Sequence, residues 1–179
     1  MVAFATHGLM PGELPGVSKP ALALAPGPDP AVSPLLELDE PPPYGVINPD
    51  GLSDVLLLCE HALPRIPRRL AHLGLPKSER LRHIGWDIGA LALARDLSAR
   101  LDSALFHTSY SRLVVDCNRP SDNPSQIPET SETTAIPGNL RLSAAARAER
   151  LEALFDRRGV ILAEDVSVPF PSMTLHIDA

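Results

Sequence analysis

Proline is concentrated at the start of this chain, where eleven of its twenty prolines precede Gly51. Each proline fixes the backbone φ angle and lacks an N–H donor, so a segment this rich in proline sustains neither a helix nor a paired strand. We therefore predict that residues 1–45 form a flexible, proline-rich tail. Residues 46–156 are predicted to form the folded domain, and residues 157–179 a divergent second tail.

Charge and hydropathy exclude two broad classes of partner. The chain carries 16 basic and 22 acidic residues, and it has no clustered basic surface of the kind that binds nucleic acid. It also lacks an apolar run long enough to cross a bilayer. Its two cysteines cannot form a disulfide framework and fit a reducing, cytoplasmic compartment. The sequence leaves the oligomeric state open.

Within the predicted domain, apolar patterning indicates alternating strands and helices. Residues 55–58 form a continuous apolar run that is typical of a strand buried on both faces. Apolar residues at helical spacing predict a helix over residues 86–101, and residues 104–107 and 113–116 are two further strand candidates. Ser143 is a good N-cap for a last helix. This order predicts an α/β fold with a mixed sheet and flanking helices.

Cys59, Glu60 and His61 directly follow the first predicted strand. Ligands of α/β sheets gather at the carboxyl ends of strands, and a neutral imidazole there is a good zinc ligand. Two other interpretations remain. Cys59 and His61 could form a thiol–imidazole pair, or Cys59 could be a core residue beside a surface histidine.

Asp87 lies at the predicted start of the helix over residues 86–101, beside the only tryptophan of the chain. A carboxylate at this position often caps the free N–H groups of the helix. The functional alternative is a metal-binding carboxylate held rigidly in the first turn, with glycines at positions 85 and 89 permitting close backbone approach.

Asn118 and Arg119 follow the third predicted strand and precede Pro120. A guanidinium with a neighbouring amide is well suited to bind a carboxylate group. The alternative is an ordinary surface ion pair between Arg119 and Asp116 or Asp122. The polar segment over residues 121–138 is long for a compact domain, which is typical of a functional or a disordered loop.

Taken together and in order, six short motifs resemble the N-formylglutamate amidohydrolase family. The resemblance covers roughly residues 51–155 and implies an α/β fold of the zinc-exopeptidase type, here incomplete. It also implies hydrolysis of the formamide bond of N-formylglutamate or a related N-acyl amino acid. The motifs are Leu-Leu-Leu-Cys-Glu-His-Ala at 56–62, Arg-Ile-Pro at 65–67, His-Ile-Gly-Trp-Asp-Ile-Gly-Ala at 83–90, Tyr-Ser-Arg-Leu-Val-Val-Asp-Cys-Asn-Arg-Pro at 110–120, Ile-Pro-Glu at 127–129 and Ile-Pro-Gly-Asn at 136–139.

The resemblance also assigns roles to residues. It implies that His61 and Asp87 are the first two ligands of a Zn²⁺ ion, while Asn118 and Arg119 resemble the carboxylate clamp of zinc carboxypeptidases. Glu60 is the candidate base that carries the proton to the leaving nitrogen.

Family members run beyond this length, and their second half carries a His-Ser-Phe motif that supplies the third metal ligand. The surroundings of His176 do not match that motif, although His176 remains a possible replacement. The alternative function is therefore a C-terminally truncated, inactive family member or a weak ligand-binding fragment.

Overall fold

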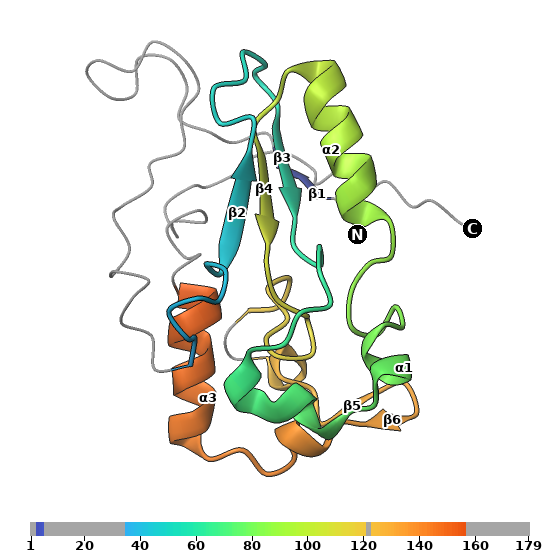
Figure 1. The fold of residues 1–179 in the computed structure, drawn as a ribbon, viewed down its shortest axis with the longest axis vertical. Coiled ribbons are helices and arrows are strands. Elements are labelled where there is room, and N and C mark those ends of the chain that lie inside the picture. The colour runs from blue at the N-terminus through green and yellow to red at the C-terminus, as the bar shows by residue number, and fades with distance from the viewer. Residues whose placement is uncertain (1–2, 6–34, 121–122, 157–179) are drawn as a thin grey trace.

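The computed structural model describes residues 3–5, 35–120 and 123–156 (Figure 1). Short strands and helices are joined by long loops. In chain order the elements are β1 (Ala3–Ala5), β2 (Tyr44–Ile47), β3 (Leu56–Cys59), the 3-10 helix η2 (Arg68–Gly74), α1 (Lys77–Arg80), α2 (Ala90–Leu101), β4 (Leu105–Thr108), η3 (Pro124–Gln126), β5 (Thr130–Ser131), β6 (Thr134–Ala135), η4 (Pro137–Asn139), α3 (Ala144–Leu151) and the π-helical turn η5 (Glu152–Asp156). In Figure 1 the larger sheet and α2 lie in the upper half of the view, and the long loops lie in the lower half with α1, α3 and the β5–β6 hairpin. We call this lower part the loop-rich half.

The larger sheet is mixed and has the strand order β1-β3-β4-β2. β3 and β4 are parallel, with Leu57 opposite Leu105, whereas β1 and β2 pair antiparallel at the two edges. Figure 1 shows the carboxyl ends of β3 and β4 directed toward the loop-rich half of the molecule. The predicted α/β class with a mixed sheet is therefore confirmed.

The apolar runs predicted as the first two strands correspond to β3 and β4, each displaced by one residue. Leu57 within β3 and Leu105 at the start of β4 are fully buried, because α2 packs against both strands. The predicted start of the last helix is also confirmed. Ser143 is the N-cap residue of α3, and its Oγ accepts a hydrogen bond from the N–H of Ala146 at 3.1 Å.

Helix α2 starts later than predicted and buries a different face. It begins at Ala90, because Gly89 has a left-handed φ of 86° that a helix interior does not accept. Its buried residues are Leu91, Ala94 and Ser98, whereas the apolar residue Leu93 is 40% exposed. Only the residues that face β3 and β4 are buried, so the apolar periodicity marked a wider stripe than the sheet covers.

The prediction of a strand over residues 113–116 is wrong. Leu113, Val114 and Val115 are buried, but the first two lie in a turn and Val115 in the irregular segment after it, not in the sheet. Ser111 holds this turn, because its carbonyl accepts from the N–H of Val114 at 2.9 Å and its Oγ from the N–H of Leu113 at 3.2 Å. An apolar run indicates burial, but it does not by itself distinguish a strand from a buried turn.

The buried apolar residues form two separate clusters. The sheet cluster joins β3, β4 and α2 and includes Leu57, Leu91 and Leu105. The loop cluster is larger and includes Leu73, Leu113 and other buried side chains of the loop-rich half, among them Leu35, Ile66, Ile84, Ile127, Ile136 and Leu154. The loop-rich half is therefore an apolar core built without a sheet.

The predicted tails fall mainly outside the described residues. This applies to residues 6–34 and to residues 157–179, which include His176. Leu35, near the end of the predicted first tail, is 2% exposed within the loop cluster. Ala3–Ala5 forms the paired strand β1, so the expectation that the proline-rich segment holds no paired strand is wrong at this point. The flexibility of the tails stays a prediction. In the described part of the chain, no helix is long and apolar enough to cross a membrane.

Candidate functional site

His61 lies just after β3, and its imidazole is held between two carboxylates. Its Nε2 is 2.8 Å from Oδ1 of Asp116, and its Nδ1 is 3.3 Å from Oδ2 of Asp87. The residue is 2% exposed. Because the Nε2 contact is the shorter one, we assign the ring proton to Nε2, which donates to Asp116. Nδ1 then directs its lone pair toward Asp87.

Asp116 is the most highly connected carboxylate of this cluster. Besides His61, its Oδ1 accepts from the N–H of Asn118 at 3.0 Å, and its Oδ2 accepts from Nη2 of Arg112 at 2.9 Å. Burial raises the pKa of Asp116, but the hydrogen bond from His61 and the nearby charges outweigh this and lower the pKa to about 2. Asp116 is therefore ionised at neutral pH. The sequence alone indicated Asp116 only as a surface partner of Arg119.

Asp87 reaches the cluster from a loop, not from the first turn of a helix as predicted. It lies two residues before Gly89, the N-cap residue of α2. Its backbone N–H donates to the carbonyl of His61 at 2.9 Å, which ties the start of this loop to the end of β3. Oδ1 of Asp87 is also 3.5 Å from Nη1 of Arg112. The backbone bond, rather than helical geometry, holds Asp87 beside His61.

Cys59 and Glu60, which precede His61 in the chain, have different environments. Cys59 is buried in the sheet cluster, and burial raises the pKa of its thiol to about 11. Both ring nitrogens of His61 already contact carboxylates, so the geometry favours a structural cysteine over a thiol–imidazole pair. Glu60 is partly buried, and its carbonyl accepts a hydrogen bond from the Thr108 hydroxyl. The role of Glu60 as a base stays a prediction.

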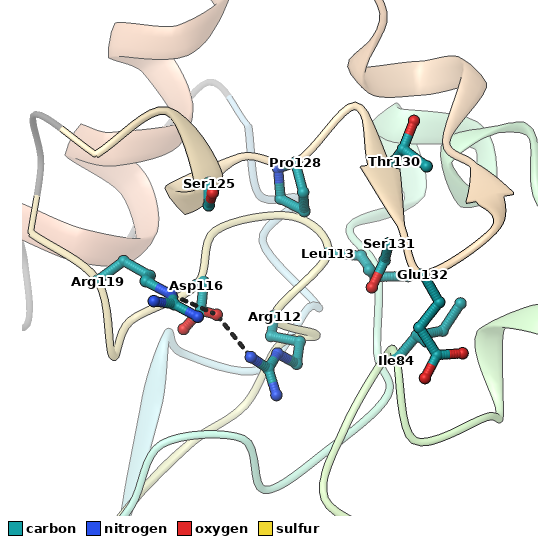
Figure 2. Close-up of a pocket in the computed structure, with 10 residues that line it drawn as sticks. All are labelled: Ile84, Arg112, Leu113, Asp116, Arg119, Ser125, Pro128, Thr130, Ser131 and Glu132. Atoms are coloured by element: carbon teal, nitrogen blue, oxygen red, sulfur yellow. Dashed lines mark hydrogen bonds and ion pairs between the residues drawn. The ribbon is translucent and has the colours of Figure 1, made fainter.

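A pocket of about 200 Å³ adjoins this cluster (Figure 2). Asp116 and Arg112 belong to both, which makes the pocket continuous with the surroundings of His61. Arg119 also lines it and has a side chain that is 47% exposed, with Nε 3.8 Å from Oδ2 of Asp116. The guanidinium therefore keeps donors available for a ligand. Asn118 is exposed and is not among the lining residues.

The segment predicted to be a functional or a disordered loop supplies the opposite side of the pocket. It contains η3, the two-stranded hairpin of β5 and β6, and η4. The pocket is lined on this side by Ser125, Pro128, Thr130, Ser131 and Glu132.

The predicted zinc ligands His61 and Asp87 lie at a separation that suits two donors to one metal ion. Two donors at about 2.1 Å from a tetrahedral zinc ion lie about 3.4 Å apart. The Nδ1 of His61 and the Oδ2 of Asp87 are separated by 3.3 Å, and both are donor types that zinc accepts. Within the described ranges, no group of three or more His, Cys, Asp or Glu side chains is arranged to hold a metal ion. The residues thus fit zinc as a pair.

Comparison with known proteins places these motifs in one family. The family model for N-formylglutamate amidohydrolase matches residues 53–157, more than half of the chain. The resemblance stated from the sequence motifs is thereby confirmed. A comparison with curated proteins finds no match.

The fold has a counterpart among solved structures. The crystal structure of a gene product from Agrobacterium tumefaciens is similar, with a TM-score of 0.67 and 41% sequence identity. The alignment covers 73% of this chain and 53% of the other, so this chain spans about half the length of that protein.

Proposed function

Since this chain belongs to the N-formylglutamate amidohydrolase family, we propose that it catalyses the zinc-dependent hydrolysis of N-formylglutamate or a related N-acyl amino acid. The products are formate, or the corresponding acid, and the free amino acid. The observation that carries this proposal is the buried imidazole of His61, whose Nδ1 faces the Asp87 carboxylate at a distance suited to two ligands of one ion. We also infer a zinc-exopeptidase-like architecture, which the parallel pairing of β3 and β4 beside an antiparallel β2 supports.

Four residues have a proposed role in this reaction: His61, Asp87, Asp116 and Glu60. His61 and Asp87 hold the zinc ion, which, when bound, lowers the pKa of a water molecule and polarises the carbonyl group under attack. Asp116 accepts a hydrogen bond from the Nε2–H of His61 and thereby keeps the Nδ1 lone pair available and the ring in place. Glu60 delivers a proton to the leaving nitrogen.

Arg119 binds the α-carboxylate of the substrate. Its guanidinium lines the pocket and is only loosely paired with Asp116, so it can donate to a carboxylate group of the ligand. Asn118, the other member of the predicted clamp, contributes through its backbone N–H, which fixes Asp116.

The ligand class is a small N-acyl amino acid, and the reaction involves neither nucleic acid nor a membrane. The cytoplasm stays the expected compartment.

A second candidate function is a non-catalytic protein that binds an amino acid weakly. The observation in its favour is that, over the part of the chain that the structure describes, metal-binding side chains gather only as a pair and not in a group of three. Zinc enzymes ordinarily supply three protein ligands, so a two-ligand site binds zinc weakly. Formate release distinguishes the two functions.

The first test measures formate release from N-formylglutamate by the purified 179-residue chain. We expect release with added zinc, loss of release after chelation, and recovery when zinc is restored, because the attacking water needs the metal. N-formyl-4-aminobutyrate, which lacks the α-carboxylate, is the matched substrate control and should have a higher KM. Arg119→Ala should raise KM for N-formylglutamate by about 10- to 100-fold, the effect of losing a charge-assisted hydrogen bond. Absence of formate from folded, zinc-supplemented protein would leave the binding function as the better account.

Asp116→Asn tests the positioning of His61. Asparagine keeps the shape of the side chain, but it removes the charge that fixes the Nε2 proton. We expect zinc affinity to fall by about 10- to 100-fold, as is usual when the hydrogen-bond partner of a metal-binding histidine is lost. Zinc affinity is measured by competition with a chromophoric chelator, alongside urea denaturation to verify folding. An unchanged zinc affinity in a folded variant contradicts this role.

A further inference from the structure

A network of polar side chains ties the β5–β6 hairpin to the segment that precedes Asp87. Arg82 donates through Nη1 to Oε2 of Glu79 at 2.7 Å and to Oγ1 of Thr134 at 3.0 Å, and through Nη2 to Oε2 of Glu132 at 2.8 Å. The other oxygen of Glu132 is 2.6 Å from Nε2 of His83. Thr134 also donates to Glu79 at 2.8 Å. We call these five residues the hairpin clasp.

The hairpin that the clasp holds is too small to keep its position alone. Its strands are two residues each, and isolated two-stranded hairpins are at best marginally stable in water. Glu132, in the turn, has a φ of 53°, a left-handed conformation that costs energy in a residue other than glycine. The Arg82 contacts, together with the hydrogen bond from His83, fix this turn. Exposed ion pairs contribute little to global stability, so the main consequence of the clasp is the position of the hairpin.

The same hairpin forms one wall of the pocket. Thr130, Ser131 and Glu132 line it. Figure 2 shows Ser131 and Glu132 on one side of the pocket and Arg119 on the other. The hydrogen bond from His83 and the charge of Arg82 lower the pKa of Glu132, which is therefore ionised at neutral pH. Ser131 therefore offers a hydroxyl group to a ligand bound by Arg119, and the contacts of Arg82 and His83 with the two oxygens of Glu132 weaken the repulsion between that carboxylate and an anionic ligand.

The three substituents on the α-carbon of an amino acid ligand can be assigned to the three sides of this site. The proposed function places the α-carboxylate on Arg119 and the acyl group beside His61 and Asp87. The side chain then extends toward the remaining wall, which is the hairpin. A side chain as long and polar as that of glutamate reaches toward this wall, whereas glycine has nothing to place there.

Building on the proposed function, we propose that the hairpin clasp determines side-chain selectivity, by holding the β5–β6 hairpin as the wall that receives the polar side chain of an N-acyl amino acid. Arg82 is its central positioning residue, because it bonds both to Glu79 on one side and to Glu132 and Thr134 on the other. Arg82 acts through the hairpin and does not itself line the pocket.

The test compares two ligands and several variants of the full chain by calorimetric titration. Arg82→Ala should weaken the binding of N-formylglutamate by about tenfold, the effect of losing well-placed polar contacts, and change the binding of N-formylglycine less than twofold. Arg82→Lys should restore part of the preference. Arg100→Ala is the matched control, since it removes an exposed ion pair with Asp96 on α2 and should affect neither ligand.

Each outcome decides the inference. Equal weakening for both ligands, or an unchanged preference for N-formylglutamate, overturns it. If Arg82→Ala does not fold, Glu79→Gln removes a clasp carboxylate without altering the pocket lining and should reduce the preference in the same direction. Wild-type protein that binds N-formylglutamate selectively without releasing formate overturns the proposed function and leaves the clasp inference intact. Wild-type protein that binds neither ligand overturns both.

Discussion

Replacing His61 by alanine is expected to reduce bound zinc to background and to lower formate release by at least about 100-fold, because the imidazole is the only nitrogen donor of the proposed pair. The substitution also leaves the Asp87 and Asp116 carboxylates without the ring that separates them. Zinc content is measured by metal analysis after gel filtration, and formate by a coupled assay.

A second histidine provides the control for non-specific zinc binding. His72 is exposed and has a left-handed φ of 59°, which asparagine tolerates, so His72→Asn should keep full zinc content and activity. Retention of stoichiometric zinc by His61→Ala contradicts the proposed ligand pair. Loss of formate release with retention of zinc would instead assign His61 a role in substrate contact.

Replacing Asn139 by alanine is expected to lower the free energy of unfolding by about 3 to 5 kcal/mol, a large part of the stability of an ordinary domain. Asn139 is 1% exposed, and its Nδ2 donates to the carbonyls of Leu113 at 2.8 Å and Pro128 at 2.7 Å. Its Oδ1 accepts from Nη1 of Arg150 at 2.7 Å. The substitution leaves one buried and one partly buried carbonyl short of a donor and a buried guanidinium short of an acceptor.

The buried guanidinium makes this prediction specific. Arg150 is 3% exposed, and burial lowers its pKa to about 10. Asn139→Ala removes one acceptor from the Arg150 guanidinium, which keeps its hydrogen bond to the carbonyl of Gly138 at 2.8 Å. Because a buried donor without its acceptor is costly, Asn139→Leu combined with Arg150→Met should be more stable than Asn139→Ala alone. Urea denaturation followed by circular dichroism measures both variants.

Asn48→Gly is the control variant. It loses an exposed hydrogen bond to Asp102 and should lower the free energy of unfolding by less than about 1 kcal/mol. A cost for Asn139→Ala no larger than that of this control contradicts the assignment.

Local patterns were sufficient to predict the centre of the sheet. The apolar run of β3 is continuous because the strand lies inside the sheet and packs against α2, and this environment requires apolar side chains at successive positions. β4 has apolar residues only at Leu105 and Phe106, followed by His107 and Thr108. The edge strand β2 was not predicted, since three prolines precede it and dominate the local composition. Its position depends on a distant contact. A Cβ atom on Gly45 would lie 2.5 Å from the His107 ring of β4.

The candidate site was predicted only in part for the same reason. His61, Asp87 and Arg119 stand out as residue types at the ends of predicted elements, and the structure brings them into one neighbourhood. Asp116 was missed as a partner of His61 because the two residues are 55 positions apart, and no local pattern records that pairing. The hairpin clasp joins residues about as far apart in sequence, so it also becomes visible only in three dimensions.

The separation of the two apolar clusters has a consequence for how the site is lost. His61 follows the sheet cluster at Cys59, whereas Asp116 follows the loop cluster at Val115, and the 2.8 Å bond between them joins the two halves. Partial unfolding of the loop-rich half therefore removes Asp116, Arg112 and the pocket while β3, β4 and α2 stay paired. The exchange rate of the His61 Nε2 proton with solvent consequently reports this partial opening, independently of global unfolding.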